Sequence, residues 1–217
     1  MRKPYPEEEK EFSGVMYWPG DPELKALKLK AHNLSYDYNA THEDDFEERA
    51  RIIDELFPDH GDRVFFQGPI YIHYGCHTKI GNNFFANFDF TIQDDTKVTI
   101  GDNANFGPGV SIVTPIHPMV GTERTALYKS DGTPMRLCYA KPVVIGNNCW
   151  FGANVTVCPG VTIGDNVVIG AGSVVTRDIP SNTFAAGVPC RVVREITEED
   201  SMKHKPDILG DFLVEKP

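Results

Sequence analysis

The sequence lacks any segment suited to a membrane or to an export pathway. It has no run of about 18 apolar residues, and its start, MRKPYPEEEKEF, carries charge without an apolar core. We therefore expect no membrane-spanning helix, no secretory leader and a cytoplasmic location.

Basic residues and paired cysteines are also scarce. The 21 Lys and Arg stand against 31 Asp and Glu, a formal net charge of −10 over 217 residues, whereas proteins that bind nucleic acid cluster positive charge. We expect no nucleic-acid partner. The five cysteines contain no CxxC pair, which argues against a disulfide framework or a common zinc knuckle and favours buried, reduced thiols: Cys76, Cys138, Cys149, Cys158 and Cys190.

Two helices are predicted in the acidic first part of the chain. Residues 1–63 carry −7 of the net charge, and the composition changes near Arg63. Asp21-Pro22-Glu23 is a helix start, and a second helix is expected from about Asp44 to Phe57, ended by Pro58. One face of each helix is apolar: Leu24, Leu27, Leu34 and Tyr38 in the first, and Phe46, Ala50, Ile53, Leu56 and Phe57 in the second.

The rest of the chain has a repeat with a period of six. The repeat has an aliphatic or aromatic residue, then usually Gly, and a small or β-branched residue in the fifth place. The positions six apart are Ile100, Phe106 and Ile112, and then Ile145, Phe151, Val157, Ile163, Ile169 and Val175, with an earlier copy at Ile80.

A period of six fits a solenoid rather than a helix or a hairpin sheet. Three hexads would make one triangular coil, with the aliphatic residues stacked inside. The Gly-Asp-Asn and Gly-Asn-Asn segments would supply positive φ and side-chain-to-backbone hydrogen bonds at the corners. The prediction is a solenoid over residues 64–196, with a helical segment at 1–63 and a C-terminal tail at 197–217 whose apolar cluster is Ile208, Leu209, Phe212, Leu213 and Val214.

One long excursion interrupts the repeats. The interval from Ile112 to Ile145 is not a multiple of six, so residues 118–141 are expected to leave the solenoid as a surface loop. His117 ends the periodic run just before this loop, and Asp94 and Asp95 stand about one coil earlier. These residues could form a site at the rim, or His117 could cap a strand and the aspartates could serve in a turn.

Several long motifs resemble the hexapeptide-repeat acyltransferases, and among them the galactoside and maltose O-acetyltransferases. The resemblance runs from about Gly14 to Ile196 and is carried by YGCHTKIGNNFFANFDFTIQDD, VTPIHP, VVIGNNCWFGANVTVCPGVTIGDNVVIGAGSVVTRDIP and FAAGVPCRVVREI.

The resemblance implies a mainly β fold, a left-handed parallel β-helix, which is an exception to the right-handed rule for parallel crossovers. It also implies a homotrimer with active sites between subunits, and acetyl-CoA as donor with no metal. His117 matches the catalytic histidine of the family. As a neutral imidazole it would take the proton from a sugar hydroxyl that attacks the thioester directly, so no cysteine nucleophile is needed.

Further site residues follow from the same motif matching. The acceptor residues are His73, Asn87 and Asp95, whose polar groups suit sugar hydroxyls, although the related enzymes have Ser in place of His73. The galactoside enzymes also use an acidic residue in this part of the chain, but Asp21 lies two positions from the matching place. Asp21 is therefore left out of the predicted site. Residues expected to contact CoA are Trp150, Ala153, Ala171, Thr176, Arg177, Arg191 and Arg194.

Two other interpretations remain at the level of sequence. One is a trimeric zinc hydratase resembling the gamma-class carbonic anhydrases, with His73, His77 and His117 as ligands, although their spacing does not fit that family. The other is a solenoid without catalytic function. The sequence leaves the acceptor sugar open.

Overall fold

The structure is a computed structural model that describes residues 2–125 and 127–210. It begins with three helices, α1 (Pro6–Ser13), α2 (Pro22–Ala40) and α3 (Phe46–Leu56). The two predicted helices are confirmed as α2 and α3. The apolar face predicted for α3 is wrong in part, because Phe46 is 66% exposed and Ala50 is also exposed, while Ile52 is buried. Asp21 begins α2 by accepting hydrogen bonds from the backbone N–H groups of Glu23 and Leu24.

Helix α1 was not predicted, because its buried face is acidic rather than apolar. Its two buried residues are Glu8 and Glu11, which are 3% and 0% exposed. No search for an apolar stripe at helical spacing would find such a face.

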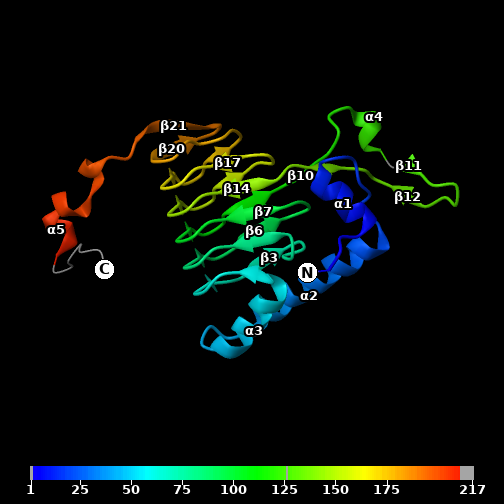
Figure 1. Cartoon of the computed structure of the whole chain (residues 1–217), viewed down its shortest axis with the longest axis horizontal. Coiled ribbons are helices and arrows are strands. Elements are labelled where there is room, and N and C mark those ends of the chain that lie inside the picture. Colours follow the sequence, from blue (N-terminus) through cyan, green and yellow to red (C-terminus); the bar gives the residue numbers. More distant parts are fainter. Residues whose placement is uncertain (1, 126, 211–217) are drawn as a thin grey trace.

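The predicted parallel β-helix is confirmed, and its strands form three flat faces (Figure 1). The first face contains β1 (Asp59–His60), β4 (Thr78–Ile80), β7 (Val98–Ile100), β14 (Val143–Ile145) and β17 (Thr162–Ile163). The second contains β2 (Phe65–Phe66), β5 (Phe85–Ala86), β8 (Asn105–Phe106), β15 (Trp150–Phe151), β18 (Val168–Ile169) and β20 (Thr183–Gly187). The third contains β3 (Ile70–Ile72), β6 (Phe90–Gln93), β9 (Ser111–Val113), β16 (Thr156–Val157) and β19 (Val174–Val175).

The last strand of the β-helix runs in the opposite direction. β21 (Cys190–Glu195) pairs antiparallel with β20, at the edge of the second face. The chain then continues through two short 3-10 helices, Glu198–Asp200 and Met202–His204, to α5 (Pro206–Leu209). This segment leads away from the end of the prism in Figure 1, and Ile208 is 72% exposed. Phe212, Leu213 and Val214 of the predicted apolar cluster lie outside the described residues.

The first coils are longer than the three hexads that the repeat predicted. Ile145 pairs with Ile163, which is three hexads later, but Ile80 pairs with Ile100, which lies two positions beyond three hexads. The two additional positions lie where the third face turns into the first. The step from Ile72 to Ile80 is eight positions instead of six. The 118–141 excursion leaves the prism at this same corner, so every insertion into the repeat falls there.

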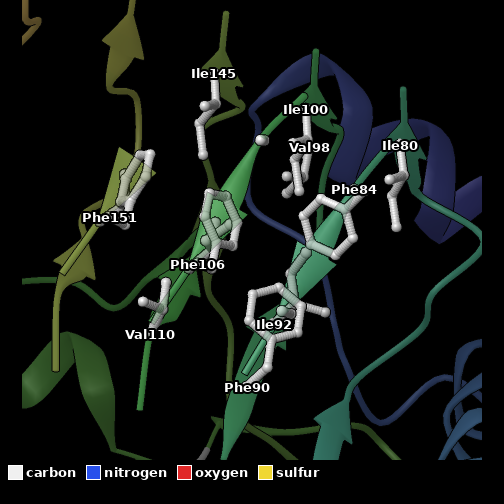
Figure 2. Close-up of a cluster of buried hydrophobic side chains, with 14 of the residues drawn as sticks. Ile80, Phe84, Phe90, Ile92, Val98, Ile100, Phe106, Val110, Ile145 and Phe151 are labelled. Carbon is white, nitrogen blue, oxygen red and sulfur yellow. The ribbon is translucent and has the colours of Figure 1, made fainter. Parts of the chain in front are cut away.

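The prism is filled by a column of inward-facing aromatic and aliphatic side chains (Figure 2). The ring centroid of Phe106 lies 5.2 Å from that of Phe84, 5.8 Å from Phe90 and 4.6 Å from Phe151. The Phe106 ring therefore packs against rings of the coils before and after it. The hydrophobic residues six apart lie in this column, as the period predicted.

Removing one ring from this column is expected to destabilise the whole prism. Phe106→Ala should lower the free energy of unfolding by about 3–5 kcal/mol, because Phe106 is 1% exposed and its neighbours are held by the coils on both sides. Urea unfolding measures the change. Phe46→Ala is the matched control, since Phe46 is 66% exposed at the start of α3, and it should change stability by less than about 0.5 kcal/mol.

Asparagines shape the corner between the first and second faces. A ladder of side-chain hydrogen bonds of 2.8–3.0 Å connects successive coils through Asn83, Asn103, Asn148, Asn166 and Asn182, all at positive φ. The glycines before them instead leave room for the next coil. A Cβ on Gly101 would lie 2.6 Å from the Asn147 side chain. The predicted positive φ values and hydrogen bonds are present, with Asn rather than Gly adopting positive φ.

The excursion has secondary structure of its own. β10 (Pro115–Ile116) leads into it, followed by α4 (Gly121–Arg124), β11 (Leu127–Tyr128), β12 (Pro134–Met135) and β13 (Tyr139–Ala140). β11 pairs with β12, and β13 returns antiparallel to β10. In Figure 1 the hairpin extends away from the prism beside α1.

The prediction of buried, reduced thiols is confirmed for three of the five cysteines. All five are free, but Cys76 is exposed and Cys158 is half-buried, so the prediction holds for Cys138, Cys149 and Cys190 only. Among the described residues, no helix has the length and apolar character needed to cross a membrane.

Candidate active site

Two corners of the prism carry the candidate site residues. The corner where the third face turns into the first holds His73, Asp95 and His117, and we call it the His117 corner. The corner where the second face turns into the third holds Asn87, and we call it the Asn87 corner. A single chain therefore brings three of the four residues to one corner.

His117 stands at the start of the excursion, as predicted. It directly follows β10, in which Pro115 pairs with Ala140 and Ile116 with Tyr139 of β13. The His117 side chain is exposed on the single chain. The strand pair fixes the backbone beside it, while the imidazole itself stays available to a substrate.

Asp95 lies one coil before His117, is buried, and has one oxygen without a partner. The residue is 3% exposed, and its Oδ1 accepts a hydrogen bond of 2.5 Å from the Tyr17 hydroxyl. Its Oδ2 has no hydrogen-bond partner among the described residues. Burial raises the pKa of Asp95, while the Tyr17 hydrogen bond lowers it. An unpaired buried carboxylate oxygen can accept a hydroxyl group.

His73 lies beside this unpaired oxygen. Its Nε2 lies 3.7 Å from Asp95 Oδ2, which is too long for a hydrogen bond. Burial, together with the charges of Lys28 and His32, lowers the pKa of His73 to about 3. The ring is therefore neutral at physiological pH and can donate at one nitrogen and accept at the other.

A buried network ties α1 to the same corner. Glu8 pairs with His77 at 2.9 Å and with Arg2 at 2.6 Å, while the Tyr74 hydroxyl donates to Glu11 at 3.0 Å. Both ring nitrogens of His77 are engaged, one with Glu8 and the other with the Asp94 carbonyl oxygen at 2.8 Å. His77 is thus a structural residue here, with no nitrogen left for a metal.

The Glu8–His77 pair predicts a pH-dependent stability. Burial opposes the charge on Glu8, but hydrogen bonds from His77, Arg2 and Tyr5 lower its pKa to about 2. A lowered carboxyl pKa means that the contribution of Glu8 is full above its unfolded pKa of 4.5 and is lost as the pH falls towards 2. Glu8→Gln should destabilise the chain by about 3–5 kcal/mol at pH 6.

The difference between wild type and Glu8→Gln is measured by urea unfolding between pH 3 and pH 7. It should shrink as the pH falls below about 4.5, where the wild type loses its own advantage. Glu9→Gln, an exposed neighbour on α1, serves as control. A Glu8→Gln deficit that is the same at every pH would contradict the assignment of the pair.

Asn87 follows β5 and lies on the other side of the third face from Asp95. Its Oδ1 accepts a hydrogen bond of 2.8 Å from the Phe88 backbone N–H. Its side chain is half-buried. Asn87 therefore does not join His73, Asp95 and His117 at their corner of the same chain.

Some of the residues expected to contact CoA lie at the Asn87 corner and others at the His117 corner. Ala153 and Ala171 lie at the Asn87 corner, beside Trp150, which is 57% exposed on β15. Thr176 and Arg177 are exposed at the His117 corner.

The two arginines of β21 have partners within the chain. Arg194 forms a bidentate pair with Asp200, with both N–O distances 2.7 Å, and Arg191 donates to its neighbour's carbonyl oxygen. A phosphate at Arg194 would have to compete with Asp200 for the guanidinium.

A cavity of about 620 Å³ is formed mostly by residues of the excursion, beginning with Pro118, which follows His117. It is lined by Met16, Pro118, Thr122, Glu123, Leu127, Leu137 and Tyr139. The residues described here contain no group of three or more His, Cys, Asp or Glu side chains arranged to hold a metal ion. His77, one of the three zinc ligands considered from the sequence, already has both ring nitrogens engaged within the chain.

Comparison with known proteins places the chain among acetyltransferases. Residues 142–177 match the family model for the bacterial transferase hexapeptide (six repeats), and residues 12–61 match the maltose acetyltransferase hexapeptide capping motif. Over 192 residues the chain is 44% identical to the galactoside O-acetyltransferase of Escherichia coli (strain K12), covering 88% of each chain. It is 38% identical to the galactoside O-acetyltransferase of Lactococcus lactis, covering 85% of this chain and 86% of that protein.

Solved structures agree with these relatives. A galactoside acetyltransferase in complex with coenzyme A superposes with a TM-score of 0.82 at 40% identity, covering 98% of this chain and 100% of that one. A maltose O-acetyltransferase from Clostridium difficile 630 superposes with a TM-score of 0.79 at 41% identity, covering 90% of this chain and 100% of that one.

Proposed function

This chain belongs to the hexapeptide-repeat acetyltransferase family, and on that premise we propose that it acetylates a hydroxyl of a sugar, with His117 as general base. As a member of that family it is an O-acetyltransferase that uses acetyl-CoA. The observation that carries the proposal is the common position of His117, His73 and Asp95 at one corner.

The chemistry assigns a separate task to each side chain. A sugar hydroxyl is a weak nucleophile at neutral pH, so a neutral imidazole at His117 takes its proton as the oxygen attacks the thioester carbonyl. The carbonyl carbon gains the sugar oxygen and loses the CoA sulfur, and the proton held by His117 passes to the departing thiolate. Asp95 and His73 hold the acceptor through other hydroxyls.

We propose that the site is completed by a second copy of the chain in a homotrimer. His117 and Asn87 lie at two different corners of one prism. Of the donor residues, Ala153 and Ala171 lie at the Asn87 corner, and Thr176 and Arg177 lie at the His117 corner. Around a three-fold axis the His117 corner of one subunit meets the Asn87 corner of the next. Such an arrangement unites both residue sets in three identical clefts.

The acceptor of this enzyme is expected to differ from that of the galactoside enzymes. His73 stands where the enzymes that the sequence resembles have Ser, and the excursion after His117 lines a cavity of about 620 Å³. Both features would alter the walls of the acceptor site.

CoA release from acetyl-CoA, followed with a thiol reagent, tests the function. The acceptor panel comprises galactosides, glucosides, maltose and amino sugars. We expect release that depends on a hydroxylated acceptor and an alkali-labile acetyl ester in the product. Binding of CoA without release for any acceptor would refute the proposed sugar acceptor, and absence of CoA binding would refute the donor as well.

A further inference from the structure

Tyr17 connects three parts of the chain that meet at the His117 corner. It lies between α1 and α2, and its side chain is 0% exposed. Its backbone N–H donates to the Cys138 carbonyl oxygen at 2.9 Å, and its own carbonyl oxygen accepts from the Cys138 N–H at 3.2 Å. Its hydroxyl donates to Asp95 Oδ1.

The Cys138 end of this connection leads directly to His117. Cys138 immediately precedes β13, and β13 pairs with β10, where Ile116 is the residue before His117. Tyr17 therefore contacts the Asp95 carboxylate and the returning strand of the excursion, which in turn pairs with the strand that precedes His117. No other described residue pairs with Cys138 through its backbone in this way.

The hydroxyl of Tyr17 also determines which oxygen of Asp95 stays free. With Oδ1 occupied, only Oδ2 remains, and it faces His73 Nε2 at 3.7 Å. This distance exceeds a hydrogen bond and would let one hydroxyl oxygen bridge the two groups. Oδ2 is closed to solvent in the single chain, so the acceptor would reach it by displacing the side chains that cover it. The hydroxyl would donate to Oδ2 and accept from Nε2–H when His73 carries its proton there.

We propose that Tyr17 is a positioning residue that keeps Asp95 in register with the His117 strand, so that Asp95 Oδ2 and His73 Nε2 together bind one acceptor hydroxyl. The inference rests on the proposed function and narrows the acceptor to a compound with at least two hydroxyls. One hydroxyl is held between Asp95 and His73, and another is presented to His117.

Tyr17→Phe tests this role, because the phenylalanine keeps the ring and the backbone pairing with Cys138. The KM for the acceptor should rise about tenfold, since a hydrogen bond to a charged group orients Asp95. The dissociation constant of acetyl-CoA should stay unchanged. Tyr38→Phe is the matched control, because Tyr38 is also a buried tyrosine whose hydroxyl donates to a chain oxygen, that of Phe66, away from the His117 corner.

Two further measurements separate positioning from a loss of stability. In an Asp95→Asn background, Tyr17→Phe should change the acceptor KM by less than about twofold, because Tyr17 acts through Asp95. The acid limb of kcat/KM for the acceptor should also move to higher pH in Tyr17→Phe, since the Tyr17 hydrogen bond lowers the pKa of Asp95. The other titratable groups around Asp95 are Asp94, Lys28, His73, Tyr74, His77, Glu11 and Cys138.

The outcomes distinguish this inference from the function on which it rests. If wild type and Tyr38→Phe are active and Tyr17→Phe matches them in KM and pH profile, Tyr17 is only a packing residue and the inference fails alone. A rise of about tenfold in the acceptor KM on adding Tyr17→Phe to the Asp95→Asn variant would also overturn the inference. Wild type without acceptor-dependent CoA release would refute the proposed function and, with it, this role of Tyr17.

Discussion

Replacing His117 with alanine is expected to lower kcat by about 10²–10⁴-fold and to leave the dissociation constant of acetyl-CoA unchanged. The loss follows from chemistry, because without the imidazole no group at this position takes the proton of the attacking hydroxyl. The fold should be unaffected, since the His117 side chain is exposed and its removal opens no cavity. CoA release at saturating acceptor and donor measures the effect.

A matched control separates the base from a general effect of losing a histidine. His42 is exposed between α2 and α3, far along the chain from the excursion, and His42→Ala should keep the activity of the wild type. The stability of both variants, measured by thermal unfolding, should match that of the wild type within about 0.5 kcal/mol, as is usual for surface substitutions. Activity of His117→Ala above about a tenth of the wild type would rule out His117 as the principal base.

Mixed trimers should recover activity that neither parent variant has. Asn87→Ala is expected to lower the activity about 10- to 100-fold, because its hydrogen bonds to the substrate are missing. If His117 and Asn87 of one site come from neighbouring chains, His117→Ala and Asn87→Ala chains refolded together at equal amounts make some sites with both residues intact. Random assembly around a three-fold axis makes about one quarter of the sites intact.

The recovery is measured as CoA release per chain after joint refolding of the two variants. About a quarter of the wild-type activity is expected, which is well above the mean of the two parents. Each variant refolded alone is the control. A mixture that shows only the mean of its parents, although native mass spectrometry confirms mixed trimers, would show that both residues act within one chain or that Asn87 has no role.

Much of the fold could be predicted because its physical requirements recur along the sequence. A prism with flat faces needs an inward-facing apolar side chain at each strand, so positions such as Phe106, Phe151 and Ile163 indicate the solenoid. Helices α2 and α3 begin at aspartates, and α2 buries the predicted Leu24, Leu34 and Tyr38. The face predicted for α3 was wrong at Phe46 and Ala50, which are exposed. The coil length was wrong for the first coils, although the spacing of eight from Ile72 to Ile80 carried the signal.

The buried polar network could not be predicted, because no local pattern identifies it. Helix α1 buries Glu8 and Glu11, which in sequence look like solvent-exposed acids. Tyr17 is one aromatic residue in an irregular segment, and its partner Asp95 lies 78 positions away. The end of the repeat pointed to His117 and Asp95, and the resemblance to known enzymes added His73 and the expected role of each residue. Their relation to Tyr17 and the separate corner of Asn87 required the structure.

Rapid-quench transfer of a labelled acetyl group tests the central claim most directly. The wild type is mixed with acetyl-CoA labelled in the acetyl group, with and without an active acceptor, and the label is followed in protein and product. The account predicts label in the acceptor ester, no labelled protein at any time, and transfer about 10²–10⁴-fold slower in His117→Ala. A burst of labelled protein that precedes the product, or equal transfer by His117→Ala, would contradict direct attack with His117 as the base.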